Sequence, residues 1–242
     1  MRLDANAALN VGGNGASTSM LTVNNRLLMN SATNSNIAGG TAPFYGSSST
    51  LEYAASYGPF QEWLAGTALT TPGVPQNVTI SAGTVTMPNS DRRVLGNLNI
   101  TGGTLALNVT SGDLYLAGNM TRASGATFTP NERAVYFNGT GTQVVTVTGG
   151  GTMTFNYLRI QESSTVQLAT GTNVTVDRNG GLTLGSSATN SLDLNGQTLT
   201  YSGGGNLNLS GGARGVTSSI AGGVFAGSAA SSMAVTIEVG AA

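Results

Sequence analysis

Six of the chain's fourteen aromatic residues fall within residues 44–63. They are Phe44, Tyr45, Tyr53, Tyr57, Phe60 and Trp63. Aromatic rings can stack on sugar rings or anchor a protein partner, and Tyr and Trp are favoured in binding hot spots. We therefore take Tyr45, Tyr53, Tyr57 and Trp63 as candidate ligand-binding residues. The competing interpretation is that these rings plug an irregular part of the core, since packing is the commoner role of large aromatics.

Three aspartates could do acid–base chemistry. Asp113, Asp177 and Asp193 each lie in or beside a segment where a strand runs into a turn. Cleavage of a glycoside needs two carboxyl groups about 5–10 Å apart, and the spacing of Asp177 and Asp193 makes them potential stacked neighbours. Asp beside Asn-Gly is also ordinary turn chemistry. The chain has no His, no Lys and no nucleophile motif, so we predict no catalytic residues and no enzyme activity.

Metal and cofactor sites have little support in the sequence. Cys is absent, which excludes disulfides and Cys-based metal sites. The turn at residues 179–181 and the segment 193–195 loosely resemble calcium-binding β-roll repeats, but the aspartates are too few for an array of sites. We therefore assign no metal site and no cofactor, and a single calcium ion in one of the turns is left as an open alternative.

Thr-x-Thr pairs recur along the chain, at positions 84/86, 127/129, 146/148, 152/154 and 198/200. On a flat face of a repetitive fold such pairs could form an ordered array, as in some ice-binding proteins. The pairs do not hold one fixed position in the repeated phrase described below, so we favour the explanation that Thr is a good strand residue. Ice binding is kept as a second alternative function.

Composition limits the partners. Only 8% of residues are charged and the net charge is −1, against about 25% charged in a typical domain. No basic patch exists to hold phosphates, so nucleic acid is excluded as a partner. No apolar run approaches the roughly 20 residues that span a bilayer, so we predict no membrane insertion. Residues 1–6 lack the apolar core of a signal peptide, and we expect an internal piece or a processed form of an exported protein.

A repeated phrase must position these side chains. Two alternating apolar residues, a Gly/Ser/Asn turn and two more apolar residues occur at 77–87, 97–107, 173–184 and 191–200. Alternation with period two is typical of a strand with one buried face, and the Val, Ile and Thr content fits strands. The turns supply the positive φ values that sharp reversals need.

The spacing of the phrases favours a right-handed parallel β-helix or a related β-solenoid. Successive phrases begin at Val78, Leu98, Leu114, Val135, Leu158, Val174, Leu192 and Leu207. These starts lie close to the spacing of roughly 20 residues that is typical of solenoids, in which like residues stack on like. The alternative is a pair of tandem β-sandwich domains, whose strands need not resemble each other. We expect irregular N-terminal coils with an aromatic-rich loop over residues 1–76 and regular solenoid repeats over 77–242.

Several segments, in order, resemble a known family. They are residues 61–66 (Gln-Glu-Trp-Leu-Ala-Gly), 72–80, 135–145, 154–160, 173–176 and 181–184. Together they are similar to the β-strand-repeat surface proteins and adhesins of the Bacteroidetes, many of which leave the cell by type IX secretion. The resemblance covers most of residues 44–210. It implies a repetitive β architecture and an extracellular or cell-surface location, and the family offers no shared catalytic residues to carry over.

The expected function is therefore structural and adhesive. We predict a non-catalytic segment of a large extracellular bacterial surface protein or filament, with further copies or repeats of the parent protein as end-to-end partners and surface glycans as candidate ligands. A carbohydrate-binding or carbohydrate-cleaving β-helix is the first alternative.

Overall fold

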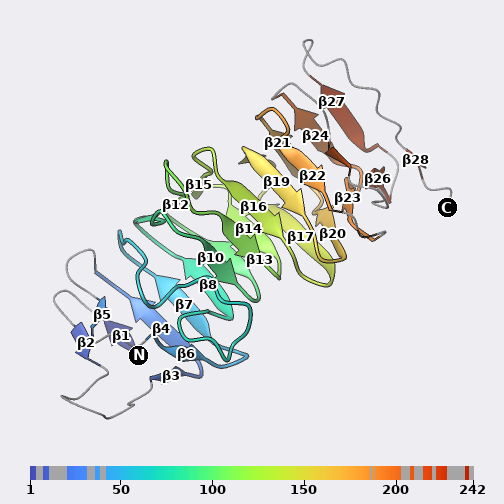
Figure 1. Ribbon diagram of the computed structural model, residues 1–242. Coiled ribbons are helices and arrows are strands. Elements are labelled where there is room, and N and C mark those ends of the chain that lie inside the picture. Colours follow the sequence, from blue (N-terminus) through green and yellow to red (C-terminus); the bar gives the residue numbers. More distant parts are fainter. Residues whose placement is uncertain are drawn as a thin grey trace.

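The chain folds as a β-solenoid in which parallel strands are stacked along a rod (Figure 1). The computed structural model describes residues 1–3, 8–10, 21–31, 36–38, 42–185, 187, 189–202, 208–209, 215–219, 222–227 and 238–239. Within these residues every element is a strand. No helix there is long and apolar enough to cross a membrane.

One sheet runs the length of the rod and contains eleven strands. At about 4.8 Å between neighbouring strands, it is about 48 Å long. In order, this long sheet contains β1 (Arg2–Leu3), β4 (Arg26–Met29), β7 (Thr50–Tyr53), β8 (Asn77–Ile80), β11 (Leu98–Ile100), β14 (Met120–Ala123), β17 (Gly141–Thr148), β20 (Ser164–Leu168), β23 (Ser191–Asp193), β26 (Gly215–Ser218) and β28 (Glu238–Val239).

A second face is formed by a six-stranded sheet. Its strands are β10 (Arg92–Val94), β13 (Leu114–Leu116), β16 (Ala134–Phe137), β19 (Tyr157–Ile160), β22 (Leu182–Leu184) and β25 (Asn208–Leu209). Two short two-stranded sheets lie at the N-terminal end. One pairs β2 (Ala8–Asn10) with β5 (Asn36–Ala38), and the other pairs β3 (Thr22–Val23) with β6 (Phe44–Tyr45).

The third face is divided into two separate sheets. The first contains β9 (Thr84–Thr86), β12 (Thr104–Ala106) and β15 (Thr127–Thr129). The second contains β18 (Gly151–Phe155), β21 (Thr172–Val176), β24 (Thr198–Tyr201) and β27 (Val224–Gly227). No strand ladder joins β15 to β18 in the described part of the chain, so the third face is interrupted between these two strands.

The register of the strands confirms the solenoid and shows which phrase starts lie one full coil apart. Paired strands are parallel, and each pairs with a strand one coil away, as Val78 does with Leu98. Phrase starts that are one full coil apart are stacked, as in Leu114–Val135–Leu158. Shorter steps, such as Leu98 to Leu114, instead carry the chain from the long sheet through the third face to the six-stranded sheet within one coil. Leu207 lies outside the described residues. Sandwich sheets are antiparallel, so the parallel register rules out the tandem-sandwich alternative.

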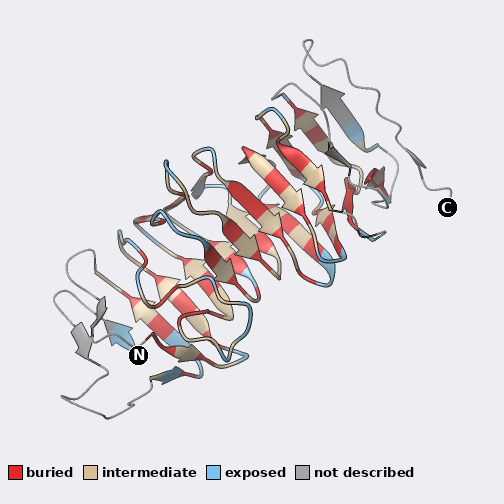
Figure 2. Cartoon of the chain, in the orientation of Figure 1, coloured by how far each residue is buried: buried red, intermediate tan, exposed pale blue. Residues whose placement is uncertain are grey.

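The core is a continuous apolar column inside the coils. Inward positions alternate with solvated ones along most of the described strands, which gives the bands of buried and intermediate residues in Figure 2. The column under the long sheet includes the fully buried Leu27, Leu51, Val78, Leu98 and Met120. Burying a side chain of this kind stabilises the fold by about 1.5–3 kcal/mol.

Asparagine side chains join successive coils at the corner before the long sheet. Asn77, Asn97 and Asn119 stack, and the backbone N–H groups of Asn97 and Asn119 each donate to the side-chain oxygen of the asparagine one coil before, at 2.9 Å in both cases. The N–H of Val144 continues the ladder onto Asn119 at 2.8 Å. Glycine precedes two of these residues because the corner is crowded: a Cβ at Gly118 would lie 2.4 Å from the Gly96 carbonyl.

The N-terminal coils share this architecture. Strand β4 pairs with β7, and β7 pairs with β8, so the long sheet runs without a break across residues 76 and 77. Between β7 and β8 the chain makes an excursion over residues 54–76 that contains only one isolated bridge, Tyr57 to Val85. This excursion contains the second half of the aromatic-rich segment, with Tyr57, Phe60 and Trp63.

Candidate functional site

The structure places three of the four candidate ligand-binding aromatics inside the solenoid. Tyr53 and Trp63 are fully buried and Tyr45 is 3% exposed. Only Tyr57 is partly accessible, and its ring packs 5.3 Å from that of Tyr53. Three of the rings therefore have no face free for a ligand in this conformation, and ligand binding at these residues stays a prediction that the burial does not favour.

A buried carboxyl group organises these rings. Glu62 is fully buried, and its Oε1 accepts hydrogen bonds from the Tyr53 hydroxyl at 2.8 Å and the Phe60 N–H at 3.0 Å. The Tyr45 hydroxyl donates to the Glu62 carbonyl at 2.7 Å. Trp63 Nε1 donates to the Arg93 carbonyl at 2.9 Å, which ties the excursion to the next coil. We call Tyr45, Tyr53, Tyr57, Glu62 and Trp63 the aromatic core cluster.

Burial dominates the electrostatics of this cluster. It raises the pKa of Glu62, although hydrogen bonds from Phe60 and Tyr53 and the nearby charge of Arg92 oppose the rise. Burial, reinforced by Glu62, also raises the pKa of Tyr45 and Tyr53 well above the usual value. In the described part of the chain, Glu62 Oε2 and Arg92 Nε have no hydrogen-bond partner. Buried polar atoms without a hydrogen-bond partner destabilise a core. Because Glu62 and Arg92 are both buried, they do not form an acid–base pair that a substrate could reach.

The three candidate aspartates are dispersed. Asp113 Oδ1 accepts from the Ala134 N–H at 2.9 Å, and its own N–H donates to Asp91, so this pair joins successive coils. Asp193 is in register with Gln167, not with Asp177, which follows β21 on the third face. The expectation that Asp177 and Asp193 are stacked neighbours is therefore wrong, because the intervening residues carry the chain between faces.

Hydrogen bonds set the state of Asp193. Burial raises the pKa of its carboxyl, but donors from Gln167, Ser219 and Asn195 outweigh that effect and hold the pKa below its usual value. A carboxylate with its lone pairs used in this way serves the turn between β23 and β24.

Aromatic side chains that the sequence did not single out line the outer side of the six-stranded sheet. Arg93, Tyr115, Tyr136 and Arg159 are in register on successive strands, and we call them the tyrosine column. The two tyrosine rings stack with centroids 4.5 Å apart and planes 7° apart, and the Arg93 guanidinium lies 4.9 Å from the Tyr115 ring. Burial raises the pKa of Tyr115 to about 12. The stacked rings cover one another, so the column serves mainly to join coils.

The break in the third face is bridged by side chains. Arg122 stands in register with the inward Ile100, yet its guanidinium reaches the gap. Nη1 donates to the Ala126 carbonyl before β15 at 2.7 Å, and Nη2 donates to the Thr152 carbonyl in β18 at 3.0 Å. Phe128 and Phe155 add a ring contact of 5.9 Å between the same two strands. Side chains thus replace the missing ladder.

At the other end of this break lies a pocket of about 430 Å³. We call it the third-face pocket. The turns after β12, β15 and β21 and the end of β18 contribute Val109, Asn131, Glu132, Asn156, Asp177 and Arg178. The pocket therefore draws its walls from several successive coils.

The wall formed by Asn131 and Glu132 has an unusual backbone. Both residues have positive φ, 46° and 61°, a conformation that costs about 1–3 kcal/mol for each non-glycine residue. Two side-chain hydrogen bonds hold it: Asn131 Nδ2 donates to the Leu107 carbonyl, and the Glu132 N–H donates to Asn156 Oδ1, both at 2.6 Å. Strain of this kind is concentrated at functional sites.

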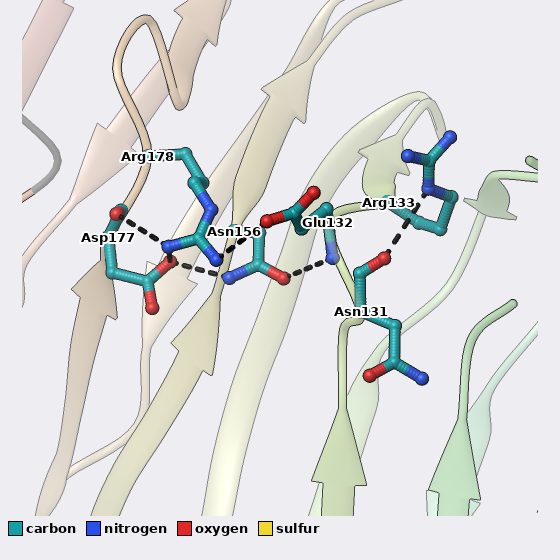
Figure 3. Close-up of polar contacts among 6 residues, drawn as sticks. All are labelled: Asn131, Glu132, Arg133, Asn156, Asp177 and Arg178. Carbon is teal, nitrogen blue, oxygen red and sulfur yellow. Dashed lines mark hydrogen bonds and ion pairs between the residues drawn. The ribbon is translucent and has the colours of Figure 1, made fainter. Parts of the chain in front are cut away.

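Figure 3 shows how Arg178 closes the opposite side. Its Nη2 lies 3.0 Å from Glu132 Oε1, and its Nη1 lies 3.8 Å from Asp177 Oδ1. Asn156, which is 5% exposed, donates from Nδ2 to Asp177 Oδ1 at 2.6 Å. One buried amide thus joins the two walls, while Arg133 points away from the group (Figure 3).

The pocket is suited to polar recognition. Two carboxylates, one guanidinium and a buried amide face a common cavity, and they could accept and donate hydrogen bonds to a hydroxylated ligand. Among the described residues, no group of three His, Cys, Asp or Glu side chains could hold a metal ion. The residues of the pocket come from separate coils, so their proximity is not visible in the sequence. The sequence shows only that polar residues follow apolar strands at these turns.

The Thr-x-Thr pairs are more ordered than the sequence indicated. In register on the third face stand Thr84–Thr104–Thr127, Thr86–Ala106–Thr129, Thr152–Asn173 and Thr154–Thr175–Thr200. The Thr198 N–H donates to Asn173 Oδ1 at 2.9 Å. We call these columns the threonine face. Four of the five pairs thus lie on the third face, two in each of its sheets, whereas 146/148 lies in β17 of the long sheet, so the five pairs do not share one position.

Comparison of the chain with protein-family models, curated proteins and solved structures finds no match.

Proposed function

We propose that the chain is a structural and adhesive segment of an extracellular bacterial surface protein, without catalytic activity. The observation that carries the proposal is the uninterrupted stacking of the coils along the eleven-stranded sheet. Because successive coils are stacked in register along the rod, side chains from distant parts of the sequence form continuous columns on its surface. Such a rod can act as an extended spacer, and its stacked repeats present similar side chains at regular intervals along an extended binding surface.

The side-chain ladders support a load-bearing role. The asparagine ladder bonds coil to coil through Asn77, Asn97 and Asn119, and Asp91 and Asp113 form a shorter ladder at another corner. These bonds run in the same direction as the hydrogen bonds between strands. A pull along the rod therefore loads many parallel contacts, while local opening at one coil leaves its neighbours paired.

The proposal is tested on cells that express the chain and on the purified protein. An antibody against the chain should label intact cells, and external protease should remove the label. Beads coated with the folded protein should adhere to surfaces coated with glycoprotein or polysaccharide, whereas beads coated with heat-denatured protein should not. Labelling only after cell lysis would overturn the location, and equal adhesion of folded and denatured protein would overturn the adhesive role.

The threonine face favours a second candidate, recognition of an ordered surface such as ice. In the described part of the chain, the columns Thr84–Thr104–Thr127 and Thr154–Thr175–Thr200 have no hydrogen bond from their hydroxyls to protein. Strand geometry spaces such groups about 4.8 Å apart across strands and about 6.6 Å apart along them. Thermal hysteresis and ice-recrystallisation assays test this candidate, with Thr127→Lys predicted to abolish any activity. Absence of both effects in the unmodified protein would exclude it.

A further inference from the structure

The third-face pocket has the size and construction of a small-ligand site. Its volume of about 430 Å³ lies within the range of roughly 300–1,000 Å³ that is typical of such sites. It lies at the break between β15 and β18, where the regular surface of the solenoid is interrupted. Stacking of the coils does not in itself require a polar cavity at this place.

The walls of the pocket are held before any ligand arrives. The buried Asn156 amide accepts from the main-chain N–H of Glu132 and donates to the carboxylate of Asp177, and Arg178 contacts the carboxylate of Glu132, which is 46 residues away in sequence. These contacts fix the Asp177 carboxylate and the backbone at Glu132, and the Glu132 carboxylate is paired with Arg178. Preorganised walls lower the entropic cost of binding.

Donors and acceptors remain for a ligand. Arg178 forms an ion pair with Oε1 of Glu132. Oδ1 of Asp177 accepts a hydrogen bond from Asn156 and lies near the Arg178 guanidinium. The second oxygen of each carboxylate has no partner among the described residues. Side-chain exposures of 62% for Glu132 and 39% for Arg178 leave these groups open to solvent. Hydroxyl groups can donate to the carboxylates and accept from the guanidinium.

The rest of the lining selects the class of ligand. Val109 is 74% exposed beside the pocket, and Pro130 and Thr154 contribute to its wall. A sugar ring combines a C–H face that can contact Val109 with hydroxyls directed at the polar side. Two carboxylates against one guanidinium give the pocket a negative balance, which disfavours uronic and sialic acids.

We infer that the third-face pocket binds a neutral saccharide unit, with Glu132, Asp177 and Arg178 as hydrogen-bonding residues and Val109 under the ring. This inference supplies a ligand class for the adhesive role proposed above and rests on that role. It does not use the aromatic core cluster.

Calorimetric or NMR titration of the full chain with glucose, galactose, mannose, N-acetylglucosamine and glucuronic acid tests the inference. We expect saturable binding of at least one neutral sugar and weaker binding of glucuronic acid. Glu132→Gln and Asp177→Asn should each weaken binding by roughly tenfold or more, because hydrogen bonds to charged groups contribute about 1.5–3 kcal/mol. The matched controls are Glu162→Gln, a glutamate that also has positive φ but lies in another turn, and Arg133→Ala, beside the pocket.

Three results would overturn the inference: no saturable binding of any neutral sugar, unchanged affinity in both carboxamide variants, or preference for glucuronic acid. Circular dichroism and thermal unfolding of each variant identify loss of fold, and Val109→Asp provides an independent exposed position at which binding should also fall. Bead adhesion is measured separately. Adhesion that survives Asp177→Asn while sugar binding is lost would reject the pocket as the adhesive site and leave the adhesive role, whereas sugar binding without adhesion would reject the role alone.

Discussion

The aromatic core cluster and the third-face pocket are two polar groupings with opposite positions in the same solenoid. In the core cluster, Tyr53 and Trp63 close around Glu62, and all three side chains are fully buried. In the pocket, Glu132 and Arg178 are open to water while Asn156 is buried. The aromatic residues that are close together in the sequence thus pack inside the core. The pocket residues, which are scattered over several coils, lie together on the surface. In a solenoid, position within the coil decides accessibility, and closeness in sequence does not.

Removing the largest side chain of the core cluster is expected to have the largest effect. Trp63→Ala empties a fully buried site and breaks the bond from Nε1 to the Arg93 carbonyl. We expect a loss of about 3–5 kcal/mol in the free energy of unfolding, measured by denaturant titration. Phe60→Ala is the control, because Phe60 is 56% exposed in the same excursion. Similar losses in the two variants would contradict the inward position of Trp63.

The pH dependence of stability tests the charge within the same cluster. The pKa of Glu62 is raised in the fold, so the native protein binds a proton more readily than the unfolded chain. Its contribution to stability is full below the unfolded value of about 4.5 and is lost as pH rises through the raised pKa.

Glu62→Gln should remove this component. The difference in unfolding free energy between the wild-type chain and the variant should therefore shift against the wild type as pH rises above about 4.5. Groups shifted in the opposite direction, such as Asp193, cancel in the difference. Denaturant titrations across this pH range measure it, and Glu162→Gln serves as the control in an exposed turn. A difference that does not vary with pH would contradict a raised pKa at Glu62.

The tyrosine column lies between the two extremes, half-buried on the outer side of the six-stranded sheet. A double-mutant cycle on Tyr115→Ala and Tyr136→Ala should give a coupling free energy of about 0.5–1.5 kcal/mol, since the rings stack at 4.5 Å. Thermal or chemical unfolding of the four proteins measures it. Additive losses would show that the stacked rings do not stabilise each other.

The strands and the stack could be predicted from the sequence, because period-two alternation is visible in neighbouring residues and similar phrases recur about one coil apart. The same alternation contained an unused signal: Tyr53 shares the inward face of its strand with Leu51, whereas Tyr115 points outward between Leu114 and Leu116. The pocket could not be predicted in this way. It depends on the break between β15 and β18 and on Arg178 reaching Glu132, and coils of unequal length conceal such contacts in the sequence.

The smallest expected effect on stability belongs to the pocket. Arg178 and Glu132 form an exposed ion pair, and such pairs contribute about 0–1 kcal/mol. Arg178→Ala should therefore leave the unfolding free energy almost unchanged while weakening the sugar binding inferred above. Denaturant titration at low and high salt checks the first part and sugar titration checks the second. A stability loss close to that of Trp63→Ala would mean that Arg178 holds the break in the third face together, and the contrast between a packing cluster and a binding pocket would no longer stand.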